Sequence, residues 1–196
     1  RLIRADDFIL CADGGTRHAL TLGLLPRVII GDLDSATFDL QPLTQKGTQV
    51  IQYPRDKNET DLELALEYAI EQNYREIVIV AALGGRLDQT LGNLALLASV
   101  QLATLNIRLD DGLESASFCR DQAEVQGRRG DLVSLIPWGG DVRGVCTEGL
   151  RWPLSNETLC AHQTRGISNE MLGDVAHVQI ASGLLLIIHR RLTTEN

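Results

Sequence analysis

Short apolar runs alternate with longer amphipathic stretches through the first half of the chain. Four such runs, at residues 8–11, 28–30, 49–53 and 77–80, have the length and composition of β-strands. The clearest amphipathic stretch follows Thr60, where apolar side chains recur at the spacing of a helix with one buried face. Its apolar positions are Leu62, Ala65, Leu66, Ala69 and Ile70. This alternation of strands and helices predicts an α/β fold with a parallel sheet.

The predicted helices have recognisable starts. Thr60 is expected to cap the first helix, with Asp61 and Glu63 in the first turn, where the helix dipole favours negative charge. A second helix is expected after the glycine pair at residues 84–85. The second helix includes Leu91, Leu94, Ala95 and Ala98.

The second half of the chain shows short strands and turns, without a convincing long helix. An apolar run at residues 132–136 and an alternating run at 175–180 are typical of strands. A turn at residues 181–183, followed by a further apolar run, predicts that the last two strands form a hairpin. We therefore predict an α/β domain over residues 1–112 and an all-β domain over residues 113–196.

Composition and charge narrow the range of functions. The sequence has 196 residues, 44% of them hydrophobic, and a formal net charge of −8. These values predict a globular protein without a nucleic-acid or membrane partner, and no apolar run reaches membrane-spanning length. The four cysteines and four histidines show no metal-binding spacing, so we expect reduced thiols in a cytoplasmic protein and structural or surface histidines. An acidic protein that binds a phosphorylated ligand needs a bridging cation, for which Mg²⁺ is suited.

Acidic side chains follow all four predicted strands of the first half. Because the carboxyl ends of parallel strands meet at one edge of a sheet, where ligands bind, we expect these carboxylates to converge on one crevice. Like charges at close range need a counter-ion, and a divalent cation with oxygen ligands is the simplest one. The six residues are Asp13, Asp32, Asp34, Asp56, Asp61 and Asp88.

Some of these residues also have structural explanations when they are taken singly. Asp13, before two glycines, suits a tight turn or a helix cap. Arg86 and Asp88 suit a surface ion pair beside a turn, although an arginine at a helix start also suits phosphate. Asp32 and Asp34, one residue apart after a buried strand, serve no packing purpose, and this favours a metal site.

Five motifs occur in the order of the thiamine pyrophosphokinase family, which the chain resembles along nearly its whole length. They are Ala-Asp-Gly-Gly (12–15), Gly-Asp-Leu-Asp-Ser (31–35), Asp-Lys-Asn-Glu-Thr-Asp (56–61), Gly-Gly-Arg-Leu-Asp-Gln (84–89) and Gly-Ile-Ser-Asn-Glu (166–170). The resemblance implies a Rossmann-like α/β catalytic domain followed by a smaller β-sandwich that binds thiamine. It also implies Mg²⁺-dependent transfer of the pyrophosphoryl group of ATP to thiamine, giving thiamine diphosphate and AMP. The implied assembly is a homodimer whose active sites lie between the α/β domain of one subunit and the β domain of the other.

The resemblance assigns roles to individual residues. The family's metal and catalytic carboxylates are matched by Asp32, Asp34 and Asp61. Positions that line the crevice or approach the phosphates of ATP are matched by Asp13, Lys57, Thr60, Arg86, Asp88 and Gln89. Positions near thiamine are matched by Ser168, Asn169 and Trp152. A half-buried place in the sandwich is the alternative for this tryptophan.

The expected mechanism is an in-line attack of the thiamine hydroxyl on the β-phosphorus of ATP, with AMP as the leaving group. Lys57 and Arg86 would add positive charge at the phosphoryl oxygens, and Asp61 would accept the hydroxyl proton.

The sequence departs from the family in two places. Asn58 stands where many relatives carry Asp, so it is not counted as a ligand. A further strand that relatives usually have before the first helix is not found here.

Two other functions fit part of the sequence. An Asp-x-Asp motif after a strand also occurs in haloacid-dehalogenase-like phosphatases, where Asp32 would be the nucleophile, but the later motifs would then have no purpose. A non-catalytic thiamine diphosphate sensor would have no need of Asp34 and Asp61 together. A dinucleotide-binding dehydrogenase is not expected, because no Gly-x-Gly-x-x-Gly follows a strand.

Overall fold

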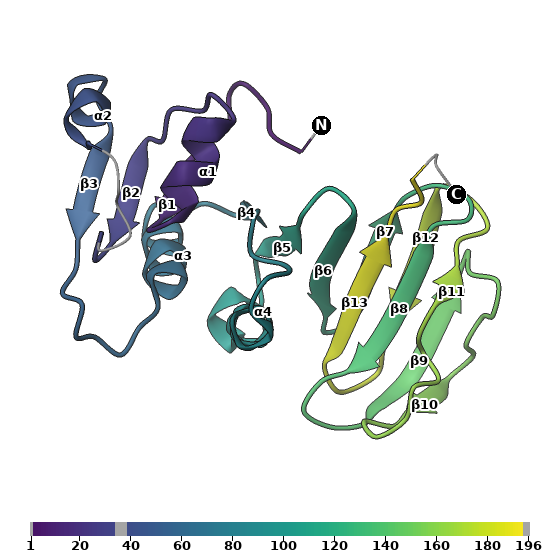
Figure 1. Cartoon of the computed structure of the whole chain (residues 1–196). Coiled ribbons are helices and arrows are strands. Elements are labelled where there is room, and N and C mark those ends of the chain that lie inside the picture. Colours follow the sequence, from purple (N-terminus) through teal and green to yellow (C-terminus); the bar gives the residue numbers. More distant parts are fainter. Residues whose placement is uncertain (1, 34–38, 194–196) are drawn as a thin grey trace. The chain divides into compact units, whose positions relative to one another are not determined.

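The computed structural model describes residues 2–33 and 39–193 (Figure 1). Asp34 and Ser35, two residues of the second motif, lie outside this described part. The chain divides into two compact units, Arg1–Arg75 and Glu76–Asn196. Among the described residues, the helices are all too short or too polar to cross a membrane.

A three-stranded parallel sheet forms the centre of the first unit. Its strands are β1 (Leu10–Ala12), β2 (Val28–Gly31) and β3 (Gln49–Gln52), in the order β1-β2-β3. All four residues of the central strand β2 are buried, which is typical of a strand covered on both faces. The parallel sheet predicted from the sequence is confirmed for these strands, and β1 begins two residues later than predicted.

Helices cover both faces of this sheet. They are α1 (Gly15–Thr21), α2 (Gln41–Gln45) and α3 (Asp61–Glu71). Successive side chains of a strand point to opposite faces. Ile29 of β2 accordingly packs with Ala19 of α1 and Leu43 of α2, whereas its neighbours Val28 and Ile30 pack with Leu64 of α3. Strand β2 is therefore packed against helices on both faces of the sheet.

Helix α3 begins where the sequence predicts. The Thr60 hydroxyl oxygen accepts a hydrogen bond of 3.2 Å from the Glu63 amide and caps the helix. Three of the five predicted apolar positions are buried, but Leu62 and Ile70 are only half-buried. Leu64, outside the predicted face, is buried against Val28 and Ile30 of β2, so the face of α3 that packs on the sheet is rotated from the predicted one.

The second unit contains two sheets. The six-stranded sheet has the order β11-β8-β13-β6-β5-β4, and the four-stranded sheet has the order β10-β9-β12-β7. Strands of the first sheet are β4 (Glu76–Ile79), β5 (Asn106–Asp110), β6 (Glu114–Cys119), β8 (Leu132–Pro137), β11 (Asn169–Glu170) and β13 (Leu185–Arg190). Strands of the second are β7 (Gln122–Gln126), β9 (Val142–Glu148), β10 (Glu157–Leu159) and β12 (Val175–Gln179). Two helices, α4 (Leu87–Leu97) and the short 3₁₀ helix Val100–Leu102, connect β4 with β5.

The fourth predicted strand, β4, pairs in parallel with β5 and belongs to the six-stranded sheet. Strand–helix alternation predicts strands but does not say which strands pair, so the sequence did not reveal this. Strand β5 then pairs antiparallel with β6, with Leu109 opposite Ala116. The six-stranded sheet therefore runs through residue 112, where we predicted the boundary between the domains.

The two sheets of the second unit pack face to face as a β-sandwich with one hydrophobic core. Val133 and Leu135 of β8 contribute to this core from one sheet, and Ala176 and Val178 of β12 contribute from the other. The alternation predicted for residues 175–180 is confirmed, because Ala176, Val178 and Ile180 are all buried. The β-sandwich expected from the resemblance is therefore present.

The predicted hairpin of the last two strands is wrong. Strand β12 pairs with β7 and β9, whereas β13 pairs with β6 and β8 in the opposite sheet. The connecting turn crosses between the layers, and the Ala181 amide donates to the Arg143 carbonyl at 2.9 Å. Gly183 has a φ of 106°, a left-handed conformation that suits glycine. Alternation of apolar residues is the same for strands that pair and for strands that stack, so the sequence pattern did not distinguish the two.

Candidate active site

Three aspartates from separate loops lie together in the first unit. Asp13 follows β1, Asp32 follows β2, and Asp61 begins α3 after β3. One carboxylate oxygen of each lies within 4.8 Å of those of the other two, and all three residues are half-buried. Parallel strands bring these loops to one edge of the sheet. We call Asp13, Asp32 and Asp61 the carboxylate cluster.

Gly31, the last residue of β2, allows the carboxylate cluster to form. A Cβ atom at this position would lie 3.1 Å from the Asp13 Cβ and 3.2 Å from the Asp61 Cγ, which is tighter than side chains normally pack. The Ile30 carbonyl accepts a hydrogen bond of 2.8 Å from the Asp13 amide, and the Gly31 carbonyl accepts one of 3.0 Å from the Tyr53 amide. The backbone of β2 therefore fixes both neighbouring loops against a position with no side chain.

Lys57 reaches into the carboxylate cluster from the loop before α3. Its Nζ atom lies 2.9 Å from Asp61 Oδ1, and only 12% of its side chain is exposed. The hydrogen bond to Asp61 raises the pKa of Lys57, burial opposes this rise, and the charges of Asp61, Asp32 and Asp13 add to it. Its ammonium group therefore feels all three carboxylates, although the ion pair is formed with Asp61.

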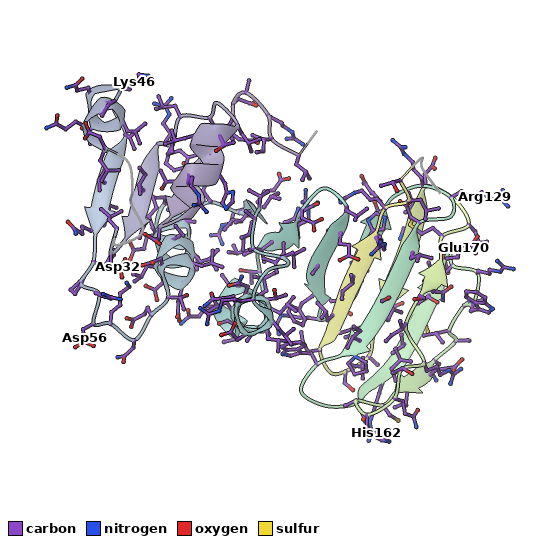
Figure 2. The ribbon with its side chains drawn as sticks, viewed as in Figure 1. Asp32, Lys46, Asp56, Arg129, His162 and Glu170 are labelled. Atoms are coloured by element: carbon purple, nitrogen blue, oxygen red, sulfur yellow. The ribbon has the colours of Figure 1, made fainter. Side chains whose placement is uncertain are left out.

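Other predicted residues of the first unit are arranged differently. Asp56 is exposed and lies outside the carboxylate cluster (Figure 2). Thr60 is also exposed, and its hydroxyl caps α3, so it positions Asp61 at the helix start. Asn58 is exposed. Asp34 lies outside the described residues. Of the carboxylates singled out from the sequence that the structure describes in the first unit, Asp13, Asp32 and Asp61 are thus brought together and Asp56 is not.

Arg86, Asp88 and Gln89 lie at the start of α4, in the second unit. Arg86 Nε donates to Asp88 Oδ1 at 3.1 Å, and the guanidinium also contacts the second carboxylate oxygen. This hydrogen bond to Arg86 is the main cause of the lowered pKa of Asp88, against a smaller opposing effect of desolvation. Side-chain exposure is 74% for Arg86 and 64% for Asp88. Their geometry is that of the surface ion pair considered from the sequence, with the arginine open to a ligand.

The residues predicted to lie near thiamine come together on the β-sandwich. Trp152 and Asn169 exchange two hydrogen bonds: the Trp152 amide donates to Asn169 Oδ1 at 3.1 Å, and Asn169 Nδ2 donates to the Trp152 carbonyl at 2.7 Å. The same Asn169 oxygen accepts the Glu170 amide at 2.9 Å. Trp152 is 57% exposed, so the half-buried alternative is wrong. The tryptophan therefore stands on the surface, with its backbone held by Asn169.

The sandwich core anchors this pair of segments. Leu150 and Met171, which lie two residues from Trp152 and Asn169 along the chain, form an antiparallel bridge and are 2% and 0% exposed. Arg151 lies over the Trp152 ring, with its guanidinium carbon 5.1 Å from the ring centroid, and makes an ion pair of 2.8 Å with Glu170. One face of the ring is thus partly occupied by a cation.

Ser168 is held one residue before Asn169. Its amide donates to Ser134 Oγ of β8 at 3.0 Å, and its φ is 59°. Two residues earlier, the Gly166 carbonyl accepts the Leu135 amide at 2.8 Å, and a Cβ atom at Gly166 would overlap the Leu135 carbonyl oxygen. Gly166 therefore lets the loop that carries Ser168 lie directly on the backbone of β8.

Our interpretation of the sequence missed two features of the carboxylate cluster. The pair Lys57–Asp61 has a spacing of four residues, a signal that was available because such pairs often interact near a helix. The contacts of Gly31 join three separate loops, so nothing in its local sequence indicates them.

Comparison with known proteins identifies the family. A model described as "Thiamin pyrophosphokinase, catalytic domain" matches residues 1–109, and one described as "Thiamin pyrophosphokinase, vitamin B1 binding domain" matches residues 121–185. The chain belongs to the thiamine pyrophosphokinase family. The carboxylate cluster lies within the part that matches the catalytic domain. Trp152, Ser168 and Asn169 lie within the part that matches the vitamin-binding domain.

Individual members of the thiamine pyrophosphokinase family are similar over most of the chain. A thiamine pyrophosphokinase of Bacillus subtilis is 31% identical over 181 residues, which cover 90% of this chain and 84% of the relative. Thiamine pyrophosphokinase 2 of Arabidopsis thaliana is 29% identical, over 94% of this chain and 78% of the relative.

Solved structures agree with this assignment. The crystal structure of thiamine pyrophosphokinase from Bacillus subtilis superposes with a TM-score of 0.85 and 25% identity, over 97% of this chain and 91% of that one. The yeast enzyme has the same fold, with a TM-score of 0.73 at 16% identity, over 94% of this chain and 78% of that one.

Proposed function

We propose that this protein is a thiamine pyrophosphokinase, which transfers the pyrophosphoryl group of ATP to the hydroxyl group of thiamine and releases AMP. The observation that carries this proposal is the carboxylate cluster, in which three loops hold oxygen atoms within 4.8 Å of one another. Membership of the family and the match of residues 121–185 to its vitamin B1 binding domain support thiamine as the second substrate.

Mg²⁺ fits the donor set of the carboxylate cluster. All three donors are carboxylate oxygens, which Mg²⁺ prefers, and ligand oxygens around an octahedral Mg²⁺ lie about 3–4 Å apart. Asp13, Asp32 and Asp61 therefore need only small movements to hold the ion. When bound there, Mg²⁺ would supply positive charge that offsets the negative charge developing during transfer. The resemblance names Asp34 as a further ligand and catalytic residue, which remains part of the proposal.

The remaining roles in the α/β region follow the same proposal. Asp61 accepts the proton of the thiamine hydroxyl as the oxygen attacks the β-phosphorus. Lys57 and Arg86 donate to the phosphoryl oxygens, and the exposed, open guanidinium of Arg86 supports its part in this. The proposed surroundings of ATP are completed by Asp13, Thr60, Asp88 and Gln89.

Thiamine is proposed to bind at the exposed ring of Trp152, with Ser168 and Asn169 beside it. An exposed indole ring offers a flat apolar face to an aromatic ligand, and its electron-rich face attracts a cation such as thiamine. The side-chain oxygen Oδ1 of Asn169 already accepts hydrogen bonds from two backbone amides, so we propose that this side chain acts mainly by holding Trp152 in place.

Several broader features are proposed on the family resemblance. We propose a homodimer with active sites between the α/β domain of one subunit and the β domain of the other. The Rossmann-like catalytic domain over residues 1–112 and the β domain over 113–196 are proposed as functional regions, and family matches over residues 1–109 and 121–185 support them. The proposed location is the cytoplasm, which the four free cysteines support.

The test is AMP release from ATP and Mg²⁺, with and without thiamine, followed by chromatography together with thiamine diphosphate. We expect AMP only when thiamine is present, matched one-for-one by thiamine diphosphate. Release of inorganic phosphate without thiamine would favour the phosphatase with Asp32 as its nucleophile. Tight binding of thiamine diphosphate without turnover of ATP would favour the sensor.

A further inference from the structure

Lysine is rare in this chain, and one of its two lysines lies at the carboxylate cluster. The sequence has 18 basic residues, of which only Lys46 and Lys57 are lysines. Lys57 places its ammonium group 2.9 Å from Asp61 Oδ1, an oxygen atom that is buried from solvent. Lys46 is exposed at the end of α2, before β3, and Figure 2 shows it at the opposite end of the first unit from Asp32.

An ammonium group at this place changes the energetics of the carboxylate cluster. Three half-buried carboxylates within 4.8 Å of one another repel, and this repulsion opposes folding when no cation is bound. The Lys57 ammonium attracts all three and is in direct contact with one of them. It therefore stabilises the arrangement that a divalent cation would use.

We propose that Lys57 is a resident counter-ion, which holds Asp61 while the carboxylate cluster is without a metal and leaves it when a divalent cation binds. This inference rests on the proposed metal site. An ammonium group and a dication cannot share the buried Asp61 oxygen without strong repulsion at such short range. Cation binding thus exchanges one positive charge for another, and Lys57 lowers the affinity of the carboxylate cluster for the free metal ion.

The local structure allows this exchange. Lys57 lies before the capping residue Thr60, outside the hydrogen bonds of α3, so its side chain can turn without disturbing the helix. A lysine has a flexible four-carbon stem and a compact charge with rotatable donors, whereas the planar fork of an arginine fixes its partner geometry. Once released, the ammonium group is next to the metal site, where the phosphates of the nucleotide would arrive. One side chain therefore serves in turn as counter-ion and as phosphate ligand.

The test is calorimetric titration of Mn²⁺ into the nucleotide-free protein. The variant Lys57→Met is expected to bind Mn²⁺ about tenfold more tightly than the wild type, because no ammonium group has to be displaced. Its melting temperature should fall in the presence of EDTA and recover with Mn²⁺. Lys46→Met removes the same formal charge at the far end of the unit and should bind Mn²⁺ as the wild type does.

Each outcome of this titration decides one question. Binding by Lys57→Met that is equal to or weaker than that of the wild type would overturn the exchange and leave the metal site standing. Absence of Mn²⁺ binding in both proteins would overturn the proposed metal site, and the exchange with it. Binding by Lys57→Met alone would be the strongest support for a competing ammonium group.

A second measurement is made on the wild-type chain and does not depend on folding of a Lys57 variant. Labelling with ε-¹³C lysine gives signals from two residues, which Lys46→Met assigns. Saturation with Mg²⁺, verified by calorimetry, should shift the Lys57 signal as it loses its carboxylate partner and leave the Lys46 signal in place. An unchanged Lys57 signal at saturation would overturn the exchange.

Discussion

The aspartates of the two units have opposite surroundings. In the second unit, Asp110 and Asp131 are almost completely buried, at 1% and 2% exposure. Each accepts hydrogen bonds from other groups of the same unit. In the first unit, Asp13, Asp32 and Asp61 are half-buried and turned toward one another. Both arrangements place carboxylates out of full contact with water, but only the arrangement in the first unit groups negative charges together.

Asp110 shows how a single carboxylate is satisfied inside the protein. Arg191 donates to both of its oxygens at 2.8 Å, and the Gly112 amide donates at 3.0 Å. Burial works to raise the pKa of Asp110, but the bonds from Arg191 and Gly112 outweigh it, so the pKa lies below its usual value. This side chain ties the end of β5 to the segment after β13.

Asp131 is satisfied in a similar way. It accepts the Leu192 amide at 2.8 Å and the Arg128 amide at 3.0 Å, and His189 Nε2 lies 2.9 Å away. Burial opposes the lowering of its pKa, and the bonds from Leu192 and His189 again prevail. A carboxylate that is surrounded by the protein's own donors serves structure. Carboxylates that face one another can serve an added cation, and the first two of the three predictions below test this difference.

The largest effect is expected when the carboxylate cluster loses one charge. We predict that Asp32→Asn lowers kcat by about a thousandfold, because the metal site loses a charged ligand. The melting temperature in EDTA should stay the same or rise, since repulsion within the carboxylate cluster decreases. Steady-state assays of AMP release and thermal melts measure the two quantities.

Asp56→Asn is the matched control for this change. Asp56 precedes α3 as well but is exposed and outside the carboxylate cluster, so kcat should remain close to that of the wild type. A large loss of melting temperature in Asp32→Asn would mean that Asp32 resembles Asp110, and the contrast between the two units would then be wrong.

The second prediction concerns stability. Asp110→Asn should lower the free energy of unfolding at pH 7 by about 2–3 kcal/mol, because it leaves the charge of Arg191 uncompensated in a partly buried place. A carboxyl whose folded-state pKa is lowered adds stability above its unfolded pKa of about 3.9 and loses it as pH falls through the folded pKa. The difference between wild type and variant should therefore shrink below about pH 4.

Urea unfolding at pH 7, 5 and 3 measures this prediction. Asp111→Asn is a suitable control next in the chain, because Asp111 is exposed and accepts only nearby backbone amides among the contacts that the described residues make. A difference that stays constant from pH 7 to pH 3 would show that the Asp110 charge does not provide the stabilisation.

The smallest effect is expected at Asn169, a polar side chain used for structure beside a proposed binding site. Asn169→Ala removes both bonds to the Trp152 backbone, so we predict that KM for thiamine rises about tenfold while kcat and KM for ATP change little. Trp152→Phe, which keeps a flat ring, should change KM for thiamine less. An equal rise in KM for both substrates would count against a role confined to the thiamine end.

The sequence predicted the grouping of Asp13, Asp32 and Asp61, because position after a strand and the rule of parallel strands suffice for it. It did not predict that Asp56, also after a strand, stays outside, since that depends on the path of a loop. The need for glycine at position 31 was likewise not predicted, because the atoms that crowd this position belong to residues 13 and 61.

The second unit shows the same limit. Strands were recognised from alternation, but their partners were not, as the crossing at residues 181–183 shows. His189 was read as structural or surface from its isolation in the sequence. Its structural role depends on Asp131, which lies 58 residues earlier, and no local pattern spans such a distance.

Strand β13 is the last strand along the described chain, yet it lies between β8 and β6 in the interior of its sheet. During synthesis on the ribosome, these two strands emerge long before the strand that joins them. Until Leu185–Arg190 leaves the exit tunnel, both present unpaired edges, which favour association with other chains. The β-sandwich therefore completes its fold late, and ribosomes that stall near residue 180 would release a product prone to aggregation.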